Sequence, residues 1–401
     1  MPKLSFADVR LNYDPSAPQQ RFREAGLEAA FANPSAQLPS APPWPADGAP
    51  KPIVLGPPPA ETDDLSRFKG YDAVVVTWTA AEAAALAALF TPANPTSTWY
   101  EYRHGISAYI PLVTGAKAPF NDKSSEMARY YHSLGLYFPC QIGRAKVLLF
   151  KSGLHFAYDG PAVPVKKLMA EIAQAVSPKL FITTGTAGGI GTEVLLGDVV
   201  VGGSVRFDCT GQFKNEPWHD ASFTPSPLPS GALEGISPAL LQINASRVPN
   251  SRSTPKIWHG KTDAIVTTDI FAFDDSTDYY KLQGLGRVCE MGDAMVASAL
   301  EGITDLSWHA IRNASDPQIP NPTHNIEEAD QQAAQIYAKY GGLTTAASVI
   351  TTWAVIHTAA TLEPAVTHSN SGFKLGRLSP VRDSHGATED VEPSFTAKEK
   401  R

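Results

Sequence analysis

Short apolar runs alternate with helix-forming stretches through the middle of the chain. Ala73–Val76, Val147–Phe150 and Leu180–Thr183 are short and apolar, which is typical of buried strands. Because such strands alternate with helices, the sequence predicts an α/β fold whose sheet is covered by helices on both faces. The other predicted elements are strands at Gly197–Val201 and Trp308–Arg312, and helices at Ala80–Leu89, Val163–Val176, Ala294–Leu300 and Thr344–Ile356.

The two ends of the chain lack this pattern. Of the 34 prolines, 13 lie within residues 1–60, and proline disfavours regular helices and central strands because it lacks the N–H and fixes φ. We predict an extended, proline-rich N-terminal arm over residues 1–66, with one short helix at Arg21–Phe31. The arm wraps the body, reaches a neighbouring subunit or is a flexible leader. The folded domain then covers residues 67–360, and residues 361–401 form a polar tail.

Composition narrows the class of protein. The 401 residues carry 33 basic and 40 acidic side chains, a net charge of −7 that argues against nucleic-acid binding. There is no apolar run long enough for a membrane span, and the first residues lack the apolar stretch of a signal peptide. Cys140, Cys209 and Cys289 are too far apart for a zinc motif or a disulfide framework. We therefore expect a cytoplasmic protein without a metal, a cofactor or a membrane partner.

Ligands of α/β sheets bind at the carboxyl ends of the strands. We predict a glycine-rich turn at Gly185–Gly189, directly after the apolar run Leu180–Thr183, whose backbone N–H groups can approach a ligand. The segment matches neither a Walker A loop nor a dinucleotide fingerprint. A tight turn without any ligand explains it equally well.

Two acidic residues have positions suited to general acid–base chemistry. Asp316 comes just after the predicted strand Trp308–Arg312, with Ser315 beside it, and Glu82 lies one turn into the helix after the first strand. A shielded acid and an ionised base in one site suit the cleavage of a glycosidic bond. Asp316 could instead form an Asx turn before Pro317, and Glu82 could complement the helix dipole.

The order of several motifs is more specific than any one of them. GTAGG after a buried strand, then GDVVV, TDIF, EM and RNASD occur in this sequence between about residues 72 and 356. This set resembles the purine nucleoside phosphorylase/uridine phosphorylase superfamily. The resemblance implies a nucleoside phosphorylase-like α/β fold, with a central mixed twisted sheet flanked by helices. The first strand lacks the Gly-Asp-Pro-x-Arg element of the phosphorylases. The chain is therefore more similar to the 5′-methylthioadenosine/S-adenosylhomocysteine nucleosidases, and the resemblance also implies a homo-oligomer, a dimer or larger.

The resemblance assigns roles to individual residues. It implies that Glu82 orients the attacking water and that Asp316 protonates the purine at N7. Phe271 matches the aromatic residue that stacks on the base, and Met291 matches the residue against the ribose. The other residues expected to bind substrate are Thr186, Ala187, Gly188, Glu290, Asp293 and Ser315.

One position departs from the family pattern. The family usually has Glu-Met-Glu, with the second glutamate on the ribose hydroxyls, whereas this chain has Gly292 there, followed by Asp293. Either Asp293 reaches the sugar or the ribose is held differently. The missing carboxylate could also leave room for a bulkier 3′ group, or mark a protein that has lost turnover.

The function expected from the sequence is hydrolysis of the N-glycosidic bond of a purine nucleoside, of adenosine type or 5′-substituted. One alternative is a phosphate-dependent nucleoside phosphorylase that uses Arg103 or Arg144 for the phosphate. The other is a nucleoside-binding sensor with little catalytic activity, which Gly292 motivates.

Overall fold

The computed structural model describes residues 42–113 and 133–362 of the chain, without the side chains of residues 244–246. The predicted helix Arg21–Phe31 lies outside the described residues. So does the predicted tail 361–401, apart from its first two residues, which end a helix.

One mixed sheet organises the described residues, and thirteen strands belong to it. Its main path runs β1-β4-β5-β2-β6-β12-β11-β8-β9, while β13 pairs with β6 and β7. The centre is parallel, since β2 pairs in parallel with β5 and β6, and β13 pairs in parallel with β6. The four central strands are β5 (Ala145–Ser152), β2 (Ala73–Thr77), β6 (Leu180–Gly189) and β13 (Ser307–Asp316).

The remaining strands extend the sheet at its two sides, and β4 and β12 pair antiparallel with their inner neighbours β5 and β6. The predicted mixed sheet flanked by helices is therefore confirmed. The bounds of these strands are Lys51–Pro52 (β1), Tyr100–Tyr102 (β3), Gly135–Ile142 (β4), Val199–Val201 (β7), Ser204–Phe207 (β8), Ser222–Phe223 (β9), Ile257–Trp258 (β10), Ala264–Thr267 (β11) and Val288–Glu290 (β12).

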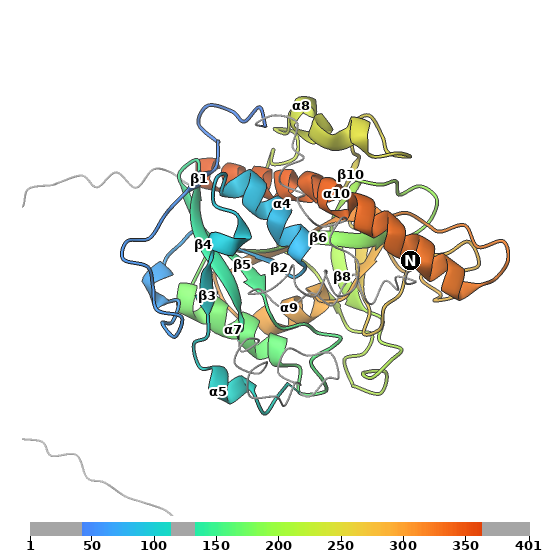
Figure 1. Ribbon diagram of the computed structural model, residues 1–401, viewed down its shortest axis with the longest axis horizontal. Helices are drawn as coiled ribbons and strands as arrows, with labels where there is room; N and C mark the ends of the chain where they lie inside the picture. Colours follow the sequence, from blue (N-terminus) through green and yellow to red (C-terminus); the bar gives the residue numbers. More distant parts are fainter. Residues whose placement is uncertain (1–41, 114–132, 363–401) are drawn as a thin grey trace, which may run out of the picture. The chain divides into compact units, whose positions relative to one another are not determined.

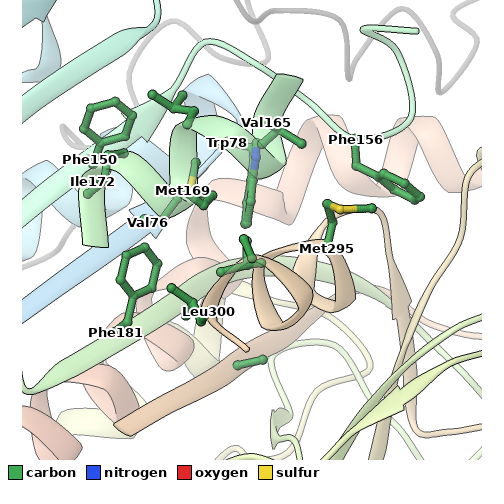
Figure 2. Close-up of a cluster of buried hydrophobic side chains, with 14 of the residues drawn as sticks. Val76, Trp78, Phe150, Phe156, Val165, Met169, Ile172, Phe181, Met295 and Leu300 are labelled. Atoms are coloured by element: carbon green, nitrogen blue, oxygen red, sulfur yellow. The ribbon is translucent and has the colours of Figure 1, made fainter. Parts of the chain in front are cut away.

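Helices cover both faces of the sheet (Figure 1). Side chains of β2 alternate between two apolar clusters: Val74 and Val76 pack with α7 and α9, while Ala73 and Val75 pack with α4 and α10. Figure 2 shows the first cluster, in which Val76, Met169, Phe181 and other apolar side chains fill the space under α7. The helices and 3-10 turns are Ala80–Phe90 (α4), Ile106–Tyr109 (α5), Pro164–Val176 (α7), Pro238–Leu241 (α8), Asp293–Leu300 (α9), Ile326–Leu362 (α10), Ser66–Phe68 (η2), Thr96–Thr98 (η3) and Gln242–Arg247 (η4).

The closing helix α10 is much longer than predicted. The sequence indicated only residues 344–356, whereas the helix begins at Ile326. By length and composition alone α10 could cross a membrane, but 78% of its most apolar window is buried inside the protein. Its buried hydroxyls are satisfied locally, as when Thr351 donates to the Ala347 carbonyl at 2.8 Å. α10 is thus packed here as a core helix.

The glycine-rich segment is a strand, and the predicted turn at Gly185–Gly189 is wrong. β6 continues to Gly189 because β13 pairs along it as far as Gly188, and β12 pairs with its last two residues. Likewise β13 does not end at Arg312 but continues to Asp316. The acid that the sequence placed beyond a strand is therefore the last residue of one.

The described part of the predicted arm, residues 42–66, packs on the body. β1 pairs antiparallel with β4, and the Trp353 indole N–H on α10 donates to the Gly48 carbonyl at 2.7 Å. The rings of Trp44 and Trp353 lie 5.1 Å apart. This part of the predicted arm is therefore in contact with the body.

Candidate active site

An open cavity lies where β2, β6, β12 and β13 end, and the empty space in it, open solvent included, is about 490 Å³. The lining includes the two predicted acids, Glu82 and Asp316, which are more than two hundred residues apart in the chain. The other lining residues are Trp78, Thr79, His155, Thr186, Ala187, Gly188, Cys289, Glu290, Met291, Arg312, Ser315 and Tyr337.

Glu82 is fixed by the start of helix α4. Thr79 is the N-cap residue, and its hydroxyl accepts the Glu82 backbone N–H at 3.2 Å. In return, Glu82 Oε2 accepts the Thr79 N–H at 2.9 Å, which completes a capping box. The cap thus turns the one acidic side chain of an alanine-rich helix back toward the end of β2.

The Glu82 carboxylate accepts several hydrogen bonds although it is only 3% exposed. Thr186 donates to Oε1 through its backbone N–H and its hydroxyl, both at 2.7 Å. The Thr77 hydroxyl and the Trp78 N–H donate to Oε2 at 2.8 and 3.0 Å. Burial alone would raise the pKa of Glu82, but the charge of Arg312 and the hydrogen bonds from Thr186 and Thr79 outweigh it and lower the pKa below 4.5. Glu82 is therefore ionised at neutral pH.

Two glycines of β6 leave room for the two acids. A Cβ on Gly185 would lie 2.4 Å from Cδ of Glu82, and a Cβ on Gly188 would lie 2.9 Å from Oδ2 of Asp316. Gly185 also has φ +148°, which side chains rarely adopt. The GTAGG motif therefore provides the close approach of backbone to both carboxyl groups.

Asp316 reaches the cavity at the end of β13, where the strand is irregular. The pairing of β13 with β6 shifts by one residue between Ala314 and Asp316, so that Asp316 lies opposite Gly188. Such bulges re-aim side chains, often next to active sites. The carboxyl group is 1% exposed, and the Ser315 hydroxyl lies 2.8 Å from its Oδ1 as a donor. Asp316 is thus a buried acid with a hydroxyl partner.

Arg312 brings a buried positive charge to the same cavity. Its guanidinium binds Asp293 through two hydrogen bonds, one of them Nε to Oδ2 at 2.8 Å. Nη1 lies 3.7 Å from Glu82 and Nη2 lies 3.6 Å from Glu290. Burial alone would lower the pKa of Arg312, but these three carboxyl groups raise it above its ordinary value.

Glu290 is another buried carboxyl group beside Arg312. Its carboxyl accepts the Asp293 N–H at 3.0 Å and the Thr267 hydroxyl. Burial, and then the nearby charge of Asp293, raise the pKa of Glu290 to about 8, against the opposing effect of Arg312.

Trp78 occupies the space beside the unusual Gly292. A Cβ on Gly292 would lie 3.2 Å from Cζ2 of the indole ring, which is tighter than ordinary contact. The Arg312 guanidinium carbon lies 5.0 Å from the centre of the same ring. Figure 2 shows Trp78 reaching down into the apolar cluster with Met169 and Met295. A side chain at residue 292 would therefore begin in close contact with the indole ring.

Two predicted site residues do not line the cavity. Phe271 is stacked on Phe273, with ring centres 5.6 Å apart. Asp293 is 1% exposed and holds Arg312. The base-stacking role of Phe271 and the sugar-binding role of Asp293 stay predictions, since neither residue is in the cavity lining. The other predicted site residues all lie in its lining.

The lining also holds residues that sequence reasoning did not select: Trp78, Thr79, His155, Cys289, Arg312 and Tyr337. Tyr337 comes from the first half of α10, and its hydroxyl lies 3.0 Å from the Thr79 hydroxyl. That half of the helix had no apolar pattern to mark it. His155 accepts the Ala157 N–H at Nδ1, 3.2 Å away, so Nε2 carries the proton in the neutral ring.

In the part of the chain that the structure describes, no group of three or more His, Cys, Asp or Glu side chains is arranged to hold a metal ion.

Comparisons with known proteins give a family and distant structural neighbours. The family model described as the phosphorylase superfamily matches residues 105–346. No curated protein matches the chain significantly. A 5′-methylthioadenosine/S-adenosylhomocysteine nucleosidase from Neisseria meningitidis is 17% identical, with a TM-score of 0.42, over 72% of this chain and 99% of that chain. Futalosine hydrolase of Helicobacter pylori is 12% identical, with a TM-score of 0.43, over 71% and 97%.

The family model spans more than half of the chain and includes β6, β12 and β13, whose residues line the cavity. The resemblance inferred from the order of the motifs is therefore confirmed. This chain belongs to the phosphorylase superfamily.

Proposed function

We propose that this protein hydrolyses the N-glycosidic bond of a purine nucleoside, of adenosine type or with a substituent at the 5′ position. Glu82 would hold the attacking water, and Asp316 would protonate the departing base. The observation that carries the proposal is that these two buried carboxyl groups line one cavity in different surroundings.

The chemistry needs that difference. Breaking an N-glycosidic bond builds positive charge on the sugar and negative charge on the base, so one group must supply a proton and another must orient water. Five hydrogen bonds and a nearby guanidinium keep Glu82 ionised. Asp316 has different surroundings, because it is buried at the end of β13, where the Ser315 hydroxyl donates to it.

Charge in the cavity favours water over phosphate as the acceptor. Among the described lining residues, Arg312 is the one arginine or lysine, and Asp293 already binds it. Arg103 and Arg144 could not replace it in this arrangement. Arg103 pairs with Glu101, and Arg144 donates to the Ala360 carbonyl, both away from the cavity lining. A phosphate dianion would thus meet several carboxyl groups and no unneutralised arginine or lysine of the described lining.

The test is to incubate the full chain with adenosine, inosine and 5′-methylthioadenosine, with and without inorganic phosphate. Free base and sugar products are then separated by chromatography. We expect free purine and the free sugar at the same rate in both conditions. Release of base only with phosphate, together with a sugar 1-phosphate, would show a phosphorylase. Tight nucleoside binding without base release under either condition would show a sensor.

A further inference from the structure

Asp293 lies behind the cavity, bound to Arg312, and the sequence does not show what its carboxylate does. Both of its carboxylate oxygens are hydrogen-bonded to Arg312, and its backbone N–H is donated to Glu290. Asp293 is itself 1% exposed and is not part of the cavity lining. The Asp293 carboxylate therefore acts on Arg312 and not on a ligand.

The guanidinium of Arg312 is held on two sides. Asp293 binds the edge that carries Nε and Nη2, while the Trp78 ring lies 5.0 Å from the guanidinium carbon. A two-point arginine–carboxylate contact fixes orientation as well as distance. The remaining nitrogen, Nη1, then lies 3.7 Å from Glu82 Oε1.

Gly292 makes this arrangement possible. A Cβ there would come within 3.2 to 3.4 Å of three atoms of the Trp78 ring. The ring would have to shift, and with it the surface against which Arg312 lies. The residue pair Gly292-Asp293 thus supplies the carboxylate for Arg312 and the space for the indole.

We propose that Asp293 is a positioning residue that fixes Arg312 at the cavity wall, with Trp78 and Gly292 as the steric parts of the same unit. The unit holds Nη1 beside the carboxylate that orients the water. The expected effect on turnover rests on the proposed hydrolysis. The expected effect on the titration of Glu290 rests only on the contacts between Asp293, Arg312 and Glu290.

Those contacts provide a readout that does not need turnover. Asp293, on the first turn of α9, raises the pKa of Glu290, and Arg312 on β13 lowers it. Glu82 faces the cluster from α4 across the guanidinium, and Asp316 and His155 share the cavity. Removing the charge of Asp293 should therefore lower the pKa of Glu290. Infrared titration of the protonated carboxyl band follows this group, and Glu290→Gln identifies the band.

The experiment compares Asp293→Asn with Asp198→Asn. Asp198 is a matched control because it is also a fully buried carboxylate bound to an arginine, Arg252 at 3.1 Å, but it lies outside the cavity lining. For Asp293→Asn we expect the Glu290 titration to move to lower pH. We also expect kcat for base release to fall on the order of 10²-fold with little change in KM, because misplacing a group in the site has that cost. Asp198→Asn should lower thermal stability only.

An unchanged Glu290 titration in Asp293→Asn, or a kcat equal to that of Asp198→Asn, would overturn the inference. If Asp293→Asn does not fold, Gly292→Ala tests the same unit through Trp78 and should lower kcat while leaving KM similar. Wild-type kcat in Gly292→Ala would also count against it. A wild type that releases no base would remove the proposed function, and the infrared comparison would still decide the contact between Asp293 and Glu290.

Discussion

Gly185 lies directly beneath the carboxylate of Glu82. A Cβ at residue 185 would come within 2.4 Å of Cδ and Oε1 of Glu82 and within 2.9 Å of Nη1 of Arg312. Real Cβ atoms essentially never make contacts this short, so the two positions are strictly dependent on each other. The glycine is required by the acid above it and not by a turn.

Gly185→Ala should therefore displace Glu82 and reduce base release on the order of 10²-fold or more. It should also destabilise the protein, because φ is +148° at this residue. Steady-state kinetics and thermal unfolding measure the two effects. Gly191→Ala is the control, since Gly191 also has a positive φ, +78°, but nothing lies within 4 Å of its Cβ position. If both variants lose activity equally, backbone strain and not contact with Glu82 is the cause.

Asp316→Asn should lower kcat by about 10² to 10⁴-fold, the usual contribution of a general acid. The amide is similar in shape and can still accept the Ser315 hydroxyl, so the fold should remain. Asp275→Asn serves as the control, because Asp275 is also fully buried and hydrogen-bonded but does not line the cavity. Asp316→Asn with wild-type turnover would refute the role of Asp316 as the acid.

Glu82 should also make stability depend on pH. Its folded pKa is lowered, so the ionised group stabilises the folded state above the ordinary value of 4.5, and this stabilisation is lost as pH falls through the lowered value. Urea unfolding of the wild type and of Glu82→Gln at several pH values should show an advantage for the wild type at neutral pH that shrinks below about pH 4.5. For Glu193→Gln, which removes an exposed partner of Arg287, the curves should stay nearly parallel. If the free energy of unfolding of Glu82→Gln differs from that of the wild type by the same amount at every pH, the lowered pKa of Glu82 would be contradicted.

The contact between residues 42–66 and α10 should contribute to stability. Trp353→Phe removes the donor to the Gly48 carbonyl and part of the packing on Trp44, which should cost about 1–3 kcal/mol in the free energy of unfolding. Trp258→Phe is a matched control, since the Trp258 Nε1 is buried without a hydrogen-bond partner among the described residues. Equal losses in the two variants would mean that the hydrogen bond to Gly48 adds nothing.

Local pattern was enough to predict the centre of the sheet and one of the two acids with its helix. β2 is a continuous apolar run because both of its faces are buried, and Glu82 is the one charged residue of the helix that follows. The glycine-rich end of β6 was misjudged because glycine has no strand preference of its own. Its strand conformation comes from β12 and β13 on either side, which are far away in the sequence.

The cavity lining could be predicted only in part for the same reason. Thr186 and Asp316 were found because motifs mark the ends of buried strands, whereas Tyr337 belongs to a helical turn with no such mark. In the sequence, Arg312 was only the last residue of a predicted strand. Arg312 is held in the site by Asp293, nineteen residues earlier in the chain. The motifs linked Asp293 to the sugar-binding position of the family, so they gave no sign of this pairing.

The buried cluster of Arg312 with Glu82, Glu290 and Asp293 has a consequence for how the protein could be altered. Exchanging buried ion pairs for apolar side chains of similar volume is often neutral or stabilising, and sites tuned for activity commonly reduce stability. Laboratory evolution that selects for heat resistance alone should therefore replace these four residues early. Variants gained in that way would keep the sheet and lose the reaction.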